Sequence, residues 1–138
     1  MSKKLICLAA ALALVVAAGA GFGVHADDET PTIGEIMVKL HKGADAPLAV
    51  LKGALKSDSP PWPKVQDTSK DFVILGASLA KNETPKGDQA GYEKLAREYF
   101  DLSKQMDDAA KEEDLEGTRS AFNKLAASCK ACHQAHKP

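Results

Sequence analysis

Apolar residues recur three and four positions apart along four stretches of the chain, which is the spacing of one face of an α-helix. The first stretch covers residues 32–56. Thr32 and Glu35 are spaced as a capping box at its start, whereas Gly43 and Pro47 would interrupt or kink a continuous helix. The pattern therefore predicts one long, broken helix that ends at about residue 56.

Three further stretches predict three further helices. A proline-rich connection at residues 57–63 precedes the first of them, and a polar connection at residues 81–88 follows it. The charge-rich residues 107–116 are interpreted as a solvated connection before the last helix. The stripes are Val65, Thr68, Phe72, Leu75 and Leu79; Tyr92, Leu95, Tyr99, Leu102, Met106 and Ala109; and Leu115, Thr118, Phe122, Leu125, Cys129, Cys132 and His136. Four amphipathic helices with short connections and no strand pattern predict an all-α protein, an antiparallel four-helix bundle.

The amino end has the organisation of a secretory signal. A short positive region with Lys3 and Lys4 is followed by an apolar run and then by small residues that end at Ala26. We expect residues 1–26 to be a cleaved signal peptide and residues 27–138 to be a single domain. The apolar run is short and rich in alanine, so we expect no stable membrane insertion. An exported chain of this kind would lie in the periplasm.

The charge balance excludes several classes of partner. Lys3 and Lys4 belong to the signal peptide, so 16 of the 18 basic residues remain against 19 acidic ones. This mild net acidity argues against nucleic acid or an anionic membrane as the main partner. The sequence also offers no serine or cysteine triad, no paired carboxylates and no glycine-rich phosphate loop, and we therefore predict that the protein is not an enzyme.

The chemistry is concentrated in the last ten residues. Cys129, Cys132 and His133 form C-x-x-C-H, the attachment motif of a c-type haem. Two cysteines three residues apart lie on one helical turn, so both thiols can reach the two vinyl groups of one porphyrin. The histidine that follows can bind the iron from the proximal side. Because the apolar stripe of the last helix runs into both cysteines, we expect one covalent haem c that faces the interior of the bundle.

Three other interpretations of the motif meet physical objections. A thioredoxin-like redox site would need a βαβ context, which the chain lacks. A zinc site would need four ligands, and Cys129, Cys132, His133 and His136 are too crowded on one helix to close a tetrahedron. A disulfide between cysteines three residues apart in a helix would be strained and would close almost no loop. Haem attachment is the interpretation that we adopt.

A single C-x-x-C-H close to the carboxyl end of a four-helix chain resembles the cytochrome c′ family, the class II c-type cytochromes. The resemblance implies that Cys129 and Cys132 form the thioether bonds and that His133 is the proximal iron ligand. Lys137 matches a position where the family usually has a basic residue near the haem. Family members often form homodimers through their first two helices, which is an expectation for this chain also.

The resemblance further implies that the distal side of the iron decides the function. High-spin members place an apolar residue there and bind nitric oxide or carbon monoxide, whereas low-spin relatives bind a methionine of the first helix and carry electrons. Met37 matches that methionine, although a methionine on an apolar helix face often only fills the core. His41, one turn further on, is an alternative ligand, and an open site is the third alternative.

We favour Met37, because a thioether ligand raises the reduction potential and closes the iron to other ligands. The sequence then predicts an exported, mono-haem, six-coordinate cytochrome that passes single electrons to periplasmic redox partner proteins. The alternative is a five-coordinate protein that binds small gases. His136 is expected to lie beside the haem edge or a propionate, and not to bind the iron.

Overall fold

The computed structural model describes residues 29–138, and in this part of the chain the regular secondary structure is all helical, without a strand. The predicted signal peptide, residues 1–26, lies outside the described residues. The helices are α1 (Ile33–His41), α2 (Pro47–Ala54), α3 (Trp62–Leu79), α4 (Gln89–Lys111) and α5 (Leu115–His136). Within the described range, no helix is both long and apolar enough to cross a membrane.

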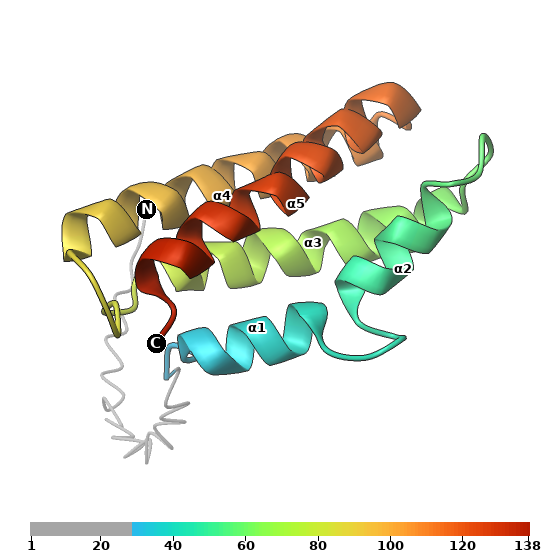
Figure 1. Cartoon of the computed structure of the whole chain (residues 1–138). Coiled ribbons are helices and arrows are strands. Elements are labelled where there is room, and N and C mark those ends of the chain that lie inside the picture. Colours follow the sequence, from blue (N-terminus) through green and yellow to red (C-terminus); the bar gives the residue numbers. More distant parts are fainter. Residues whose placement is uncertain (1–28) are drawn as a thin grey trace, which may run out of the picture.

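The helices form an antiparallel four-helix bundle, as the sequence predicts. The short helices α1 and α2 follow one another and together fill the position of the first helix (Figure 1). Helix α4 packs along both α3 and α5, and these are the most extensive contacts of the bundle. Helices α1 and α2 pack on α3, but no close backbone contact joins α1 to α5 within the described residues. The bundle is therefore open along the side where α1 faces α5.

The predicted interruption of the first helix lies between α1 and α2. Gly43 has a φ of 108°, a backbone conformation that glycine adopts without the steric cost that a side chain would bring. Pro47 is the first residue of α2, where its missing N–H leaves no helical hydrogen bond unmade. The start of α1 is fixed by Thr32 and Glu35, which form the predicted capping box.

The core agrees closely with the predicted stripes on α3 and less closely on α4. All five predicted positions of α3 are buried. On α4, Tyr92, Tyr99 and Met106 are buried, whereas Leu95 and Leu102 are only half-buried. Small residues of α4 take the remaining core positions, because α3 and α5 approach this helix closely on two sides. These residues are Ala96, Ser103 and Ala110.

One interpretation of the sequence is wrong at Asp107. This residue belongs to α4, which continues to Lys111, and only 4% of its surface is exposed. Its carboxylate accepts a hydrogen bond of 2.7 Å from the Ser69 hydroxyl and forms an ion pair with Lys111. Both contacts offset the cost of burying the charge, so Asp107 holds α4 against α3. The connection to α5 is confined to residues 112–114.

Candidate functional site

A cavity of about 630 Å³ lies along the open side of the bundle, between α1 and α5. Side chains of α1, α3, α4, α5 and the connection between α3 and α4 line it, and most of the lining is apolar. Its volume is in the range of sites that hold cofactors and small ligands. All six residues predicted for the site line this one cavity, namely Met37, His41, Cys129, Cys132, His133 and Lys137.

The α5 wall of the cavity carries the C-x-x-C-H motif. Cys129 and Cys132 are half-buried and free, and the Cys129 Sγ lies 3.5 Å from the carbonyl oxygen of Leu125. Burial raises the pKa of both thiols, and Cys129 adds to the effect at Cys132. Before the haem is attached, both thiols are therefore protonated near neutral pH. His133 is exposed at the margin of the cavity, on the same helical turn.

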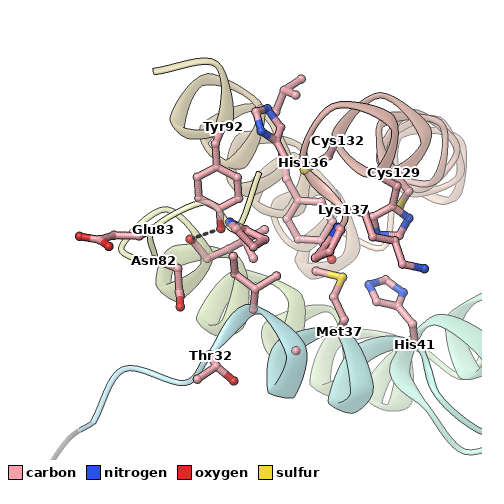
Figure 2. A pocket seen from close by; sticks show the side chains of 18 of the residues that line it. Thr32, Met37, His41, Asn82, Glu83, Tyr92, Cys129, Cys132, His136 and Lys137 are labelled. Carbon is pink, nitrogen blue, oxygen red and sulfur yellow. Dashed lines mark hydrogen bonds between the residues drawn. The ribbon is translucent and has the colours of Figure 1, made fainter. Parts of the chain in front are cut away.

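The α1 wall stands opposite, and Figure 2 shows the side chains of Met37 and His41 pointing from α1 towards the last helix. Met37 is half-buried and packs against the core. The His41 ring meets the Phe72 ring edge to face, with the centroids 6.2 Å apart. Burial lowers the pKa of His41, and the nearby charge of His133 lowers it further. His41 is thus held as a neutral imidazole, the form that can bind a metal.

Two tyrosines of α4, Tyr92 and Tyr99, form the inner wall, whereas the sequence pattern predicts both only as core residues. The Tyr92 hydroxyl donates a hydrogen bond of 2.7 Å to the carbonyl oxygen of Leu79, and burial raises its pKa to about 12. The Tyr99 hydroxyl is also buried but has no hydrogen-bond partner among the described residues. Burial raises the pKa of Tyr99 as well. No sequence signal separates these tyrosines from ordinary core residues.

His136 lies at the carboxyl end of α5, with 5% of its surface exposed. Its ring meets the Tyr92 ring edge to face at 5.6 Å. The Nδ1 atom lies 2.9 Å from the carbonyl oxygen of Lys86 and 3.2 Å from the Thr84 hydroxyl. The structure thus ties His136 to the connection between α3 and α4, a contact that its place on the apolar stripe did not reveal.

The residues around the cavity fit a haem better than they fit a metal ion alone. Between residues 29 and 138, no three histidine, cysteine or acidic side chains come close enough together to hold a metal ion. The site offers instead an apolar cavity with two thiols on one wall and, beside it, a tyrosine hydroxyl without a hydrogen-bond partner among the described residues. A buried polar atom without a partner is costly, and a bound cofactor can offset that cost.

The comparison with protein families shows to which family the chain belongs. The family model of cytochrome c′ matches residues 63–137, which is more than half of the chain. The chain belongs to the cytochrome c′ family. No curated protein and no solved structure matches it.

Membership of the cytochrome c′ family establishes that the cofactor is covalent haem c, typically one per chain. Cytochromes c′ are generally haem proteins without enzymatic activity and are typically exported to the periplasm. The matched segment begins at Pro63 and includes the C-x-x-C-H motif but not α1. The match therefore carries no information on Met37 and His41, the two residues on the distal wall.

Proposed function

We propose that this cytochrome c′ family member is an electron carrier with six-coordinate iron, bound by His133 on one side and Met37 on the other. The observation that carries the proposal is the position of Met37. It lines the cavity from α1, opposite the turn of α5 that holds Cys129 and Cys132 (Figure 2). A thioether at that position can close the distal side of the iron.

In this proposal Cys129 and Cys132 hold the haem covalently. The S–H of each thiol adds across a vinyl double bond, so that sulfur bonds to carbon and the hydrogen goes to the neighbouring carbon without net oxidation. The haem supplies an iron that gains and loses one electron. The bundle supplies an apolar cavity that excludes water and holds the haem in a fixed orientation. It also supplies the two iron ligands, whose chemical softness sets the reduction potential.

Met37 is preferred to His41 for reasons of packing. The Met37 side chain is flexible and contacts the core only in part, so it can turn towards the iron at little cost. The His41 ring already makes an edge-to-face contact with Phe72, which restrains its rotation. His41 is nevertheless the alternative ligand, because it lines the same cavity one helical turn away and is neutral.

We further propose that the partners are periplasmic redox proteins that dock near the exposed edge of the haem. Lys137 and Pro138 line the cavity where α5 ends, so the end of the chain borders this edge. Lys137 would place a positive charge there, which favours the approach of an acidic partner surface.

The test is the absorption spectrum of the oxidised and the reduced holoprotein, together with the binding of carbon monoxide. Met37→Leu conserves side-chain volume but removes the sulfur, and should convert low-spin iron to high-spin iron that binds carbon monoxide. Met106→Leu is the matched control, because Met106 is the other methionine after the predicted signal peptide and does not line the cavity. It should leave the spectrum unchanged.

Two results would contradict the proposal. If only His41→Ala opens the iron to carbon monoxide, the distal ligand is His41 and the potential should be low. If the wild-type protein is already high-spin and binds carbon monoxide, the distal site is open and gas binding is the function.

A further inference from the structure

The connection between α3 and α4 lies at one end of the bundle, and residues 82–89, here called the strap, comprise most of it together with Gln89, the first residue of α4. Helix α1 begins and helix α5 ends at this same end (Figure 1). The strap forms hydrogen bonds with both of these elements. Asn82 Nδ2 donates to the carbonyl oxygen of Pro31, just before α1, at 3.1 Å. His136, the last residue of α5, pairs with the Lys86 carbonyl oxygen at 2.9 Å.

The contact between the strap and α5 is closely fitted. A carbonyl oxygen only accepts, so Nδ1 of His136 must carry the proton that it donates to Lys86. Gly87 lies directly against this contact with a φ of 80°. A Cβ atom at Gly87 would lie 3.0 Å from His136 Nδ1 and 3.1 Å from the Ala135 carbonyl oxygen. Only glycine can adopt this positive φ without strain and also leave room for His136 and Ala135.

The strap is also cross-linked within itself. The Gln89 side chain accepts a hydrogen bond from the Thr84 N–H at 2.8 Å and donates one to the Asn82 carbonyl oxygen at 3.2 Å. Asn82 Nδ2 also donates to the Ser78 carbonyl oxygen at 3.0 Å, which ties the strap to the end of α3. These bonds make the strap a stiff unit and not a loose connection.

We propose that the strap is a positioning element that sets the separation of α1 and α5 across the haem cavity. This inference rests on the proposed function, in which α1 provides one iron ligand and α5 the other. No close backbone contact joins these helices in the described part of the chain, so their packing on each other does not fix the distance. The strap holds both at one end, and this tie keeps Met37 within reach of iron bound by His133.

The first test is Gly87→Ala in the holoprotein, because Gly87 does not line the cavity itself and can affect the haem only through its contact with His136 and the strap. The added methyl group should displace His136 from Lys86. We expect a roughly five- to tenfold larger high-spin, carbon monoxide-binding fraction, the factor that corresponds to the loss of one buried hydrogen bond.

Two substitutions of His136 separate the hydrogen bond from the bulk of the ring. His136→Phe keeps an aromatic ring beside Tyr92 but removes the donor, and should reproduce the effect of Gly87→Ala. His136→Asn retains an N–H donor near the position of Nδ1, and should restore most of the low-spin spectrum. Asn82→Ala removes the hydrogen bond to Pro31. It should also increase the high-spin fraction, in this case because the start of α1 is no longer held by the strap.

Arg119→Met is the matched control, because Arg119 ties α5 to the connection between α2 and α3 at the other end of the bundle. Its guanidinium donates to the carbonyl oxygens of Leu55 and Ser57 at 2.8 and 3.0 Å. This variant should lower the melting temperature without any change in the spin state.

The outcomes distinguish this inference from the proposed function. A low-spin wild-type protein with unchanged Gly87→Ala and His136→Phe spectra overturns the positioning role alone. An equal spectral change in Arg119→Met also overturns it, because general loss of stability would then be the cause. A wild-type protein that is already high-spin overturns both proposals.

Discussion

Tyr92 and Tyr99 stand on the same wall of the cavity, but only one of their hydroxyl groups has a partner among the described residues. Tyr92 donates to the Leu79 carbonyl oxygen, whereas the Tyr99 hydroxyl is buried without a hydrogen bond. Burial opposes ionisation of both side chains and raises both pKa values. Because the chain contains only these two tyrosines, their ionisation can be followed directly.

We therefore expect the folded protein to show almost no phenolate absorbance up to about pH 11, well above the usual tyrosine pKa. For Tyr92 the folded pKa of about 12 exceeds the usual 10.0, so its contribution to stability is fully present below pH 10.0 and is lost as the pH rises through about 12. A spectrophotometric titration with parallel circular dichroism would test this. Phenolate that forms near pH 10 in a fully helical protein would contradict it.

A second residue-scale prediction concerns the buried carboxylate of Asp107. Ser69→Ala removes the hydrogen bond of 2.7 Å and leaves this charge with Lys111 as its main partner. The free energy of unfolding should fall by about 1.5–3 kcal/mol, the usual contribution of a hydrogen bond to a charged group. Chemical denaturation measures the loss.

The control for Ser69→Ala is Lys104→Met. Lys104 and Asp108 form an exposed ion pair at 3.7 Å, and its removal should cost less than about 1 kcal/mol. Equal losses in the two variants would show that the burial of Asp107 has no energetic consequence.

At the scale of the element, α1 is the short helix on which the proposed distal ligand depends. It has nine residues and relies on its capping box for a stable start. The Thr32 N–H donates to the Glu35 carboxylate at 2.9 Å, and this bond lowers the pKa of Glu35 below 4.5. The stabilisation from this pair is present above pH 4.5 and is lost as the pH falls through the lowered pKa.

Thr32→Ala should destabilise α1 by about 1 kcal/mol, the usual cost of a lost N-cap. The high-spin fraction should increase, because Met37 leaves the iron whenever α1 opens. Asp114→Ala is the control, since Asp114 caps α5 by accepting a hydrogen bond of 3.0 Å from Gly117. Both variants should lose stability, and carbon monoxide binding should rise only in Thr32→Ala. If carbon monoxide binding rises in both variants, the opening of α1 is not its specific cause.

The elements were predictable from the sequence to the extent that local signals define them. Helical spacing, the capping box at Thr32 and the break at Gly43 and Pro47 all depend on neighbours in the chain, and all agree with the structure. The buried state of Asp107 was not predictable, because its partner Ser69 lies 38 residues away on another helix. A charged residue in a charged run carries no local sign of such a partner.

At the scale of the whole molecule, the distinction between local signals and distant contacts applies also to the haem site. The C-x-x-C-H motif that begins at Cys129 predicts the cofactor, and the position of the motif near the carboxyl end indicates the family. Both could therefore be predicted. The strap could not, because the contact between Lys86 and His136 joins residues 50 positions apart that share no pattern. The distances across the cavity are likewise a property of the assembled bundle and not of any one helix.

The arrangement of the whole bundle makes α1 the helix that depends most on the haem. In the described structure α1 contacts α2 and α3, a second face borders the cavity, and a third is exposed to solvent. Helix α4, by contrast, is held between α3 and α5 along its length. An element with few buried contacts opens locally at lower free energy, and a group that fills the adjacent cavity raises that free energy.

Removal of the haem should therefore loosen α1 before it loosens α4. In a Cys129→Ser/Cys132→Ser double variant, which cannot form thioether bonds, the amide hydrogens of α1 should exchange much faster than those of α4. In the holoprotein the two helices should be protected more nearly alike, because the haem covers the face of α1 that borders the cavity. Hydrogen exchange followed by mass spectrometry would measure both. If α1 and α4 lose protection equally in the variant, the bundle opens as one unit, and the haem stabilises the whole fold and not the distal helix in particular.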